Sequence, residues 1–375
     1  MRFIVSSSAL FTALQTVSKV IASKNTLPIL DSFLFDLKGE KLTITASDVE
    51  IRLVTTIDVM QVEGAGQFAI DSKRFIETLK ELSEQPLTIE VNEDNMVMNV
   101  EYLNGKFDIP GHRGDTYPQQ KPLKESEIAI ILESQILLNG INRSYFAMGE
   151  DEIRPVMNGI YFDFYPENLT IVASDGHKLM RLRILSINAE SHSSFILPRK
   201  PANLLKNLLM KNSDEVTLSF DDNNAHIKTT SFEMICRLIE GRYPNYNAVI
   251  PTDNPNLATI DRMSFLMALK RVSPFTNQSS GLIKVALTEN EIVIYAQDID
   301  FSTSAEERVV CQYSAEPLNI GFKVSCLIDI LTNISSENVV FHLADSSRSG
   351  VMVPSENKEN EDLLMLLVPL MLNDY

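Results

Sequence analysis

The chain has 375 residues, 44% of them hydrophobic, and a formal net charge of -17. That charge argues at face value against a nucleic-acid partner, because binding to phosphate backbones is driven by Lys and Arg. The three cysteines contain no C-x-x-C pair, which argues against disulfides and a zinc site and favours a reducing compartment. No signal peptide follows Met1, and the longest apolar run, residues 363–372, is too short to span a membrane. We therefore expect a soluble cytoplasmic protein.

The spacing of apolar residues predicts six helices along the chain. In order, they fall in windows 6–24, 71–84, 133–147, 198–211, 261–271 and 323–334. These windows hold 14 Lys and Arg against 7 Asp and Glu, a net charge of +7, whereas the rest of the chain has 19 against 43, or -24. Window 198–211 contains no acid, while window 71–84 has more acids than bases. Basic helices in an acidic chain are therefore a tendency. A general preference of helices for Lys and Arg would explain it for one helix, but its recurrence in six helices weakens that explanation.

Between these helices the sequence alternates apolar and polar residues, as in Leu42, Ile44 and Ala46 separated by threonines. Alternation of this kind near turn-forming residues predicts β-strands. One order of elements recurs along the chain: a strand, a helix, several strands, a second helix and several more strands. We therefore expect an α+β protein whose domains each place two helices on one side of antiparallel sheets.

The same strand motif occurs three times. Residues 42–48 (LTITASD) return as 169–175 (LTIVASD) and more faintly as 292–298 (IVIYAQD). A repeat of about 125 residues is the size of a whole domain and exceeds the repeat length of solenoids. The sequence therefore predicts three copies of one domain, at residues 1–125, 126–252 and 253–375.

Two other classes of protein, an enzyme and a structural or adhesive β-repeat protein, fit the sequence less well. An enzyme is suggested by Asp175 and His177, which lie two residues apart, but Asp48 and Asp298 occupy the equivalent repeat positions without a histidine nearby. A turn-stabilising aspartate is the better interpretation of Asp175. A structural or adhesive β-repeat protein is the second alternative, and it gives no reason for basic helices.

Four motifs identify a family resemblance. They are residues 26–30 (TLPIL), 173–179 (ASDGHKL), 240–246 (EGRYPNY) and 320–325 (IGFKVS). With these motifs in order, the chain resembles the bacterial DNA polymerase III beta subunit family, the sliding clamps, over its whole length. The resemblance implies the DNA-clamp fold and a head-to-tail homodimeric ring, with helices lining the hole and sheets forming the outer wall.

The resemblance also implies a function without catalysis, cofactor or metal. Such a ring is a processivity factor of DNA replication that encircles double-stranded DNA without sequence specificity. Its further partners are the replicative polymerase, the clamp loader and repair proteins, which bind through short hydrophobic motifs, and no membrane is involved.

The family's DNA contacts fall on Lys24 and Lys73, and charge alone adds Arg74 beside them. The acid-free helix window contributes Arg199, Lys200 and Lys206 as further candidates. The family also has a tyrosine pair in a position where this chain has Pro155 and Val156.

The resemblance implies two further sites, a partner-peptide pocket and a dimer interface. The interface residues are Phe107 and Ile109 in the first domain and Pro274 and Phe275 in the third. The tail departs from the family pattern by continuing to Tyr375. The expected pocket residues are Arg154, Met157, Ser174, Gly176, His177, Lys178, Leu179, Pro244, Val249, Leu366, Val368, Pro369 and Leu370.

Overall fold

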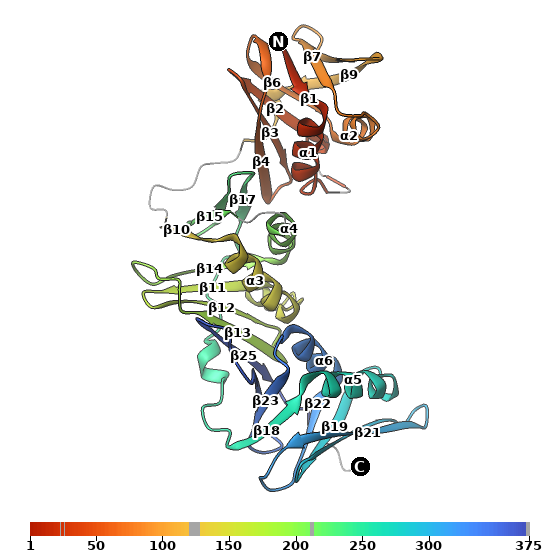
Figure 1. The fold of residues 1–375 in the computed structure, drawn as a ribbon, viewed down its shortest axis with the longest axis vertical. Helices are drawn as coiled ribbons and strands as arrows, with labels where there is room; N and C mark the ends of the chain where they lie inside the picture. The colour runs from red at the N-terminus through yellow and green to blue at the C-terminus, as the bar shows by residue number, and fades with distance from the viewer. Residues whose placement is uncertain (23, 26, 120–127, 211–213, 373–375) are drawn as a thin grey trace. The chain divides into compact units, whose positions relative to one another are not determined.

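A computed structural model describes residues 1–22, 24–25, 27–119, 128–210 and 214–372. The chain forms two compact units, which are described separately (Figure 1). Unit 1 comprises Met1–Leu138 and Asn203–Leu238, and unit 2 comprises Asn139–Ala202 with the chain from Ile239 onward. The expected boundary between residues 125 and 126 lies outside the described residues, and the three domain ranges stay a prediction.

The helices confirm the periodicity of the sequence. In the described part of the chain, one α-helix falls at each of the six windows, and α5 ends one residue past its window. Three begin at a side-chain cap, where Ser6, Asp71 and Asp261 accept a hydrogen bond from the backbone N–H three residues later. The helices are α1 (Ser7–Ser18), α2 (Ser72–Lys80), α3 (Ser134–Ser144), α4 (Arg199–Leu209), α5 (Arg262–Val272) and α6 (Val324–Asn333).

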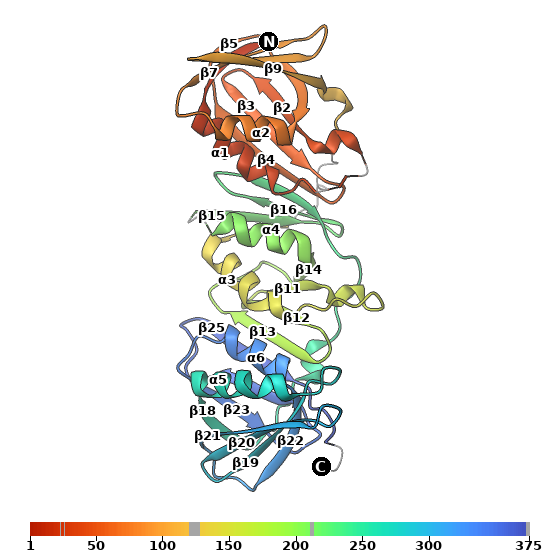
Figure 2. The same cartoon turned by 90° about the vertical axis from the view of Figure 1, so that its right-hand side faces the viewer.

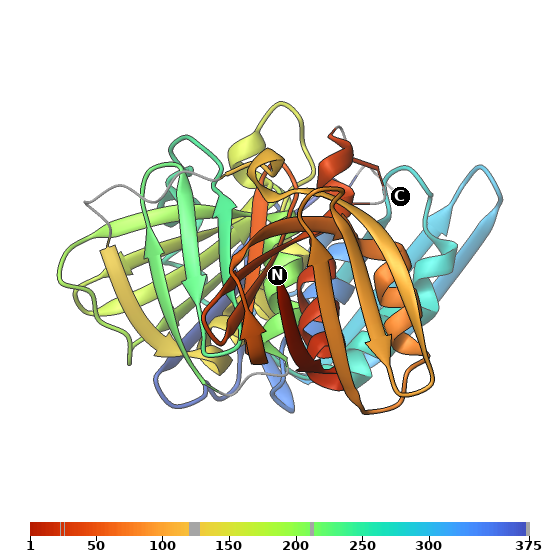
Figure 3. The same cartoon turned by 90° about the horizontal axis from the view of Figure 1, so that it is seen from above.

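Unit 1 contains an antiparallel sheet with the strand order β10-β15-β16-β17-β4-β3-β2-β6-β9-β8-β7-β1-β5. Helices α1 and α2 pack side by side against it (Figure 2). The N-terminus begins β1, which pairs with β7 and is dark red beside the orange strands in Figure 3. Its strands are β1 (Arg2–Ser6), β2 (Ser32–Lys38), β3 (Lys41–Ser47), β4 (Ile51–Asp58), β5 (Met60–Glu63), β6 (Gly66–Asp71), β7 (Pro86–Asn92), β8 (Val97–Tyr102), β9 (Gly105–Arg113), β10 (Ile128–Glu133), β15 (Glu215–Phe220), β16 (Asn224–Lys228) and β17 (Glu233–Arg237).

Unit 2 has a second antiparallel sheet, in the order β14-β11-β12-β13-β25-β24-β23-β18-β21-β20-β19-β22. Helices α5 and α6 pack against each other, and α5 also covers β20 and β21. The strands are β11 (Gly159–Tyr165), β12 (Asn168–Ser174), β13 (Lys178–Ile184), β14 (Ser193–Pro198), β18 (Asn256–Asp261), β19 (Leu282–Thr288), β20 (Glu291–Asp298), β21 (Thr303–Gln312), β22 (Leu318–Lys323), β23 (Asn338–Leu343), β24 (Gly350–Pro354) and β25 (Glu361–Leu367).

The segment after β17 crosses one face of this second sheet. Its Tyr243 and Tyr246 pack in a buried cluster with Leu179 of β13 and Leu364 and Leu366 of β25. Neighbouring residues of a strand point to opposite faces. Leu179 therefore belongs to the face covered by this segment, while the buried Met180 belongs to the other face.

One turn recurs in all three repeats and explains the motif found in the sequence. Asp48, Asp175 and Asp298 each accept two backbone N–H hydrogen bonds at Oδ1, from the residues two and three positions later. Each aspartate closes the turn between two paired strands. The interpretation of Asp175 as a turn-stabilising residue is confirmed.

The structure joins two successive repeats in the same way in each unit. In unit 1, β4 pairs with β17, and the Arg237 N–H donates to the Glu50 carbonyl over 2.9 Å. In unit 2, β13 pairs with β25, and the Val368 N–H donates to the His177 carbonyl over 2.9 Å. The α+β class with a repeated antiparallel architecture is therefore confirmed.

Within the described residues, the chain beyond β25 is held by the Val368 hydrogen bond to His177 and by a backbone bridge to β22. Leu370 pairs with Gly321, and its N–H donates to the Gly321 carbonyl over 2.8 Å. A Cβ atom at Gly321 would lie 2.4 Å from the Leu370 carbonyl oxygen, which is a backbone atom that cannot rotate away. Glycine is therefore required here by the close approach of two backbones.

We expect Gly321→Ala to lower the free energy of unfolding by about 1–3 kcal/mol, because the added methyl forces the two backbones apart. The same change should release the tail, so the Leu370 amide should exchange its hydrogen faster. Hydrogen exchange read by NMR measures this. Asn319→Ala, an exposed position two residues earlier on β22, is the control. Unchanged exchange at Leu370 in Gly321→Ala would contradict the role given to the bridge.

Candidate functional site

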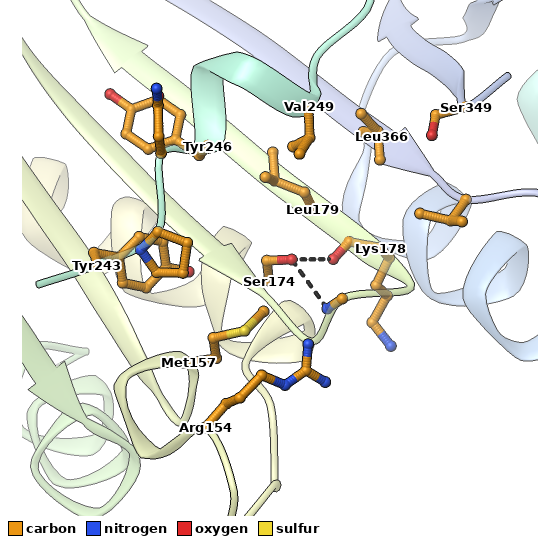
Figure 4. Close-up of a pocket in the computed structure, with 14 residues that line it drawn as sticks. Arg154, Met157, Ser174, Lys178, Leu179, Tyr243, Tyr246, Val249, Ser349 and Leu366 are labelled. Carbon is orange, nitrogen blue, oxygen red and sulfur yellow. Dashed lines mark hydrogen bonds between the residues drawn. The ribbon is translucent and has the colours of Figure 1, made fainter.

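A cavity of about 370 Å³ opens within unit 2, beside the segment that follows β17 (Figure 4). Its size falls in the range of ligand pockets, roughly 300–1,000 Å³. Its lining joins segments nearly 200 residues apart in sequence. The lining residues are Arg154, Met157, Ser174, Gly176, Lys178, Leu179, Tyr243, Pro244, Asn245, Tyr246, Val249, Ser349, Leu366 and Val368.

The floor of this pocket is made by paired strands. Leu179 of β13 lies directly opposite Leu366 of β25 in the antiparallel register, and both side chains are buried. Val368 follows β25 and keeps 36% of its surface exposed. The strand pairing therefore sets the two leucines side by side and leaves an accessible valine at the edge of the floor.

One wall of the pocket is aromatic and comes from the segment after β17. The Tyr243 ring stacks on Tyr161 of β11, with centroids 4.7 Å apart and planes 2° apart. The Tyr246 hydroxyl donates to the Asp163 carboxylate over 2.9 Å. Burial raises the pKa of both phenols, so they stay neutral at physiological pH. The wall thus offers apolar ring surface.

The opposite rim is a tight polar turn. Ser174 Oγ donates to the Lys178 carbonyl over 2.9 Å and accepts from the Gly176 N–H over 3.2 Å. Gly176 has φ of +89°, and a Cβ there would lie 3.0 Å from Arg154 Nη1. Glycine therefore permits both the turn and the close approach of the guanidinium. Arg154 itself donates from Nε to Asp151 over 2.9 Å.

Lys178 lines the pocket, but its ammonium group is engaged within the protein. Nζ lies 2.9 Å from Asp329 of α6 and 3.3 Å from Asp175. Burial disfavours the charge, but the hydrogen bond to Asp329 and the two nearby carboxylates outweigh it and raise the pKa of Lys178. The lysine is therefore charged, and it connects the pocket rim to a helix on the other side of the sheet.

The structure brings ten of the thirteen expected pocket residues to the lining. The exceptions are His177, Pro369 and Leu370. The His177 side chain is exposed while its carbonyl accepts from the Val368 N–H, and Leu370 is held against Gly321. The expectation also missed Tyr243, Asn245, Tyr246 and Ser349. The first three lie in the motif at residues 240–246, but no sequence signal indicated Ser349.

The extended tail lies only partly within the described residues. Met371 is 88% exposed and contributes nothing to the lining. Residues 373–375 lie outside the described part of the chain, as does Thr26 of the first motif.

The basic candidates lie in two parts of the chain, at residues 24–74 and on α4. Lys24, Lys73 and Arg74 of unit 1 are exposed, the last two in the first turn of α2. Lys200 is exposed on α4 and Lys206 is half-buried.

The Arg199 guanidinium packs within the chain. Nη2 donates to the carbonyls of Met148 and Gly149 over 3.0 and 3.2 Å, and the group lies over the Tyr145 ring. These contacts give Arg199 a structural role.

The expected interface residues lie on or beside two strands with one unpaired edge. Residues 105–110 of β9 pair with β8, and residues 303–310 of β21 pair with β20, and within the described chain no strand pairs with their other edges. Phe107 is half-buried against Phe75, and Ile109 is buried. Pro274 and Phe275 are exposed in a short helix that packs on β20 and β21.

The described residues contain no group of three or more His, Cys, Asp or Glu side chains arranged to hold a metal ion. Across the same residues, every helix is too short or too polar to cross a membrane.

Comparison with known proteins supplies the family. Three models of the DNA polymerase III beta subunit match: the N-terminal domain at residues 1–121, the central domain at 131–245 and the C-terminal domain at 247–368. The beta sliding clamp of Haemophilus influenzae is 28% identical over 99% of this chain and 100% of that protein. That of Pseudomonas aeruginosa is 27% identical over 97% of this chain and 99% of that protein.

Solved structures agree with the sequence matches. The crystal structure of the DNA polymerase III subunit beta from Pseudomonas aeruginosa has a TM-score of 0.94 at 27% identity, covering 99% of this chain and 100% of that one. A DnaN sliding clamp from the same organism, bound to griselimycin, has a TM-score of 0.92 at 26% identity with the same coverage. With three domain models in order along nearly its whole length, the chain belongs to the DNA polymerase III beta subunit family.

Proposed function

We propose that this chain is a sliding clamp of DNA replication: a homodimeric ring that encircles duplex DNA and tethers the replicative polymerase, the clamp loader and repair proteins through the pocket of unit 2. The clamp has no catalytic role. The observation that carries the proposal is the pocket itself, built from two repeats of a chain that matches all three clamp domains.

The pocket suits a short hydrophobic peptide. Its floor presents Leu179 and Leu366, its far wall presents two tyrosine rings, and Val368 lies exposed at the edge. The charged groups at the rim, on Arg154 and Lys178, are engaged by carboxylates of the protein. Apolar side chains of a partner therefore find apolar surface, and a few such anchors carry most of the binding energy of a peptide.

Closure of the ring follows from the internal repeat. In each repeat, one residue lies opposite the turn aspartate: Ile51, Lys178 and Thr303 in the first, second and third repeat. Two of these residues also pair with a strand of the next repeat, Ile51 with Cys236 and Lys178 with Leu367. On its other side, Cys236 lies opposite Ala225 and Leu367 lies opposite Gly350. Ile109 lies opposite Met98 in the same way. In all three repeats, this pair has the same position relative to the strand that precedes the first helix of the repeat.

By this equivalence, Thr303 of one copy pairs with Ile109 of a second copy. Continuing along the antiparallel strands, Glu306 then faces Lys106. Opposite charges across a strand pair stabilise it by roughly 0.2–1 kcal/mol, and like charges destabilise it. The register also sets Ala305 against Phe107, close to Phe275.

The basic helices support the DNA partner. Their excess of positive charge would face phosphates without reading bases, which gives contacts that depend on salt but not on sequence. An acidic exterior disfavours DNA on the outer surface. Of the six basic candidates, Lys24, Lys73, Arg74, Lys200 and Lys206 form the contact set we propose.

Val368→Asp should strongly weaken peptide binding, because it puts an unpaired charge beside the apolar anchors. We expect the dissociation constant to rise at least ~30-fold, or about 2 kcal/mol. Calorimetry with a synthetic peptide carrying a polymerase's hydrophobic clamp-binding motif measures it. Met371→Asp, in the same tail but outside the lining, should bind like the unmodified protein. Equal affinity of both variants would place the partner site elsewhere.

Lys106→Glu and Glu306→Lys should each weaken the dimer by about 1 kcal/mol per interface, since each replaces an attraction by a repulsion. Mixing the two variants should restore dimers, because both interfaces of the mixed ring again join opposite charges. Native mass spectrometry distinguishes the mixed species when one of the two variants is labelled with 15N. Glu307→Lys is the control for register, because Glu307 is the next residue of β21 and is ion-paired within the chain, with Arg271, as Glu306 is with Arg308. Rescue of Lys106→Glu by Glu307→Lys instead would show that the register is shifted by one residue.

Lys24→Glu with Lys73→Glu should weaken DNA binding and flatten its dependence on salt, by roughly one unit of slope for each phosphate that the protein no longer neutralises. Dimerisation should be unaffected. A matched change of charge at Lys38 and Lys358, exposed residues outside the helices, is the control. Filter binding over a series of salt concentrations gives the slopes. Equal slopes in the two double variants would rule out a DNA-facing role for Lys24 and Lys73.

A further inference from the structure

A buried carboxylate lies directly behind the aromatic wall of the pocket. Asp163 of β11 is only 2% exposed, and four side chains contact its two oxygens. Oδ1 lies 2.8 Å from His192 Nε2 and 3.3 Å from the Tyr161 hydroxyl. Oδ2 lies 2.9 Å from the hydroxyls of both Tyr165 and Tyr246. These four contacts occupy the acceptor positions of the Asp163 carboxylate, since a carboxylate has about four lone-pair positions.

The three tyrosine hydroxyls donate to Asp163, and His192 Nε2 lies within hydrogen-bond distance of it. Burial and the neighbouring Asp163 charge raise the pKa of Tyr246, and they act in the same direction on the pKa of Tyr165 and Tyr161. The phenols thus stay protonated and keep donating. Hydrogen bonds to a buried charge are among the strongest in proteins.

Only one of these four partners belongs to the segment that crosses the sheet. Tyr161 and Tyr165 lie on β11 with Asp163, and His192 immediately precedes β14, which pairs with β11. Tyr246 begins the short helix Tyr246–Val249 after β17, and it lines the pocket. The hydrogen bond from Tyr246 to Asp163 therefore fixes a pocket wall to the sheet below.

The second aromatic residue of the wall depends on the same group. Tyr243 stacks flat on Tyr161, and Tyr161 donates to Asp163 and contacts the Tyr246 ring edge-on at 6.2 Å. The orientations of both wall rings are thus set around one carboxylate. Asp163 itself is not among the lining residues.

We propose that Asp163 is a positioning residue for the peptide pocket: it holds Tyr246, and through Tyr161 also Tyr243, in the orientation that a partner's apolar anchors require. The inference rests on the proposed peptide-binding function. Its physical basis is preorganisation, because a wall that is already fixed loses less conformational freedom when the peptide binds. Asp163 acts through the tyrosines and makes no contact with the peptide.

The chain offers a matched pair of variants for the test. Tyr246→Phe and Tyr165→Phe each remove one hydroxyl that donates to the same Oδ2 over the same 2.9 Å, but only Tyr246 lines the pocket. Both should lower the melting temperature by similar amounts. We expect Tyr246→Phe to weaken binding of the synthetic clamp-binding peptide about tenfold, and Tyr165→Phe less than about twofold. Equal affinities of the two variants would overturn the proposal.

A double-mutant cycle separates positioning from direct contact. Asp163→Asn leaves the lining untouched but weakens the hydrogen bond to Tyr246, so it should also reduce affinity about tenfold. Combining it with Tyr246→Phe should add little, because both changes break the same link. Fully additive losses would show that the Tyr246 hydroxyl serves the peptide directly and would overturn the proposal. If Asp163→Asn fails to fold, the two tyrosine variants still decide.

The outcome also distinguishes this inference from the proposed function. If the unmodified protein does not bind the peptide, the proposed function fails. If the unmodified protein binds, Val368→Asp does not, and both Asp163→Asn and Tyr246→Phe bind normally, then the pocket is real and only the positioning role of Asp163 is wrong.

Discussion

Pairing of edge strands is the constraint on which the rest of this structure depends. A strand with an unpaired edge exposes a row of N–H and C=O groups that seek partners. The chain meets this requirement twice internally, by pairing β4 with β17 and β13 with β25. The pairing of β13 with β25 also creates the pocket floor, because its register sets Leu179 opposite Leu366 and leads the chain onward to Val368. Under the proposed function, a second copy of the chain meets the same requirement at the edges of β9 and β21.

The two internal junctions share a backbone arrangement but not a surface chemistry. At the positions equivalent to Leu179, Gly176 and Val368, the first junction has Arg52, Val49 and Arg237. Burial lowers the pKa of Arg52 and raises that of the neighbouring Tyr117 to about 12. Guanidinium groups thus replace leucine and valine, and a hydrophobic peptide would have to desolvate them. The two junctions therefore have the same backbone geometry, and their side chains make the junction of β13 with β25 apolar.

Local signals in the sequence predicted local structure well. The six helices follow from apolar spacing, and Asp175 was predicted as a turn residue because Asp48 and Asp298 share its place in the repeat. The expected pocket residues came from the family resemblance. Two of those outside the cavity lining are placed by the path of the chain: the His177 side chain is exposed to solvent, and Leu370 pairs with Gly321. No pattern within one strand reveals such contacts.

Asp163 is a stronger example of contacts that the sequence does not reveal. In sequence it is one acid within an apolar strand, and its partners His192 and Tyr246 lie 29 and 83 residues away. Nothing in either segment indicates that they meet. Only the path of the segment after β17 across the sheet brings the Tyr246 hydroxyl to the carboxylate, so the network appears only in three dimensions.

The pocket combines fixed and adaptable walls. On the fixed side, Lys178 is buried between Asp175 and Asp329, and breaking such a buried pair is costly because it strands a charge. The tyrosine wall is likewise held by a buried carboxylate. On the other side, the Arg154 side chain is 51% exposed, its ion pair with Asp151 is of the weak surface kind, and Met157 supplies a flexible thioether. Under the proposed function, the fixed walls select apolar anchors, while Arg154 and Met157 adjust to the residues that differ between one partner's peptide and the next.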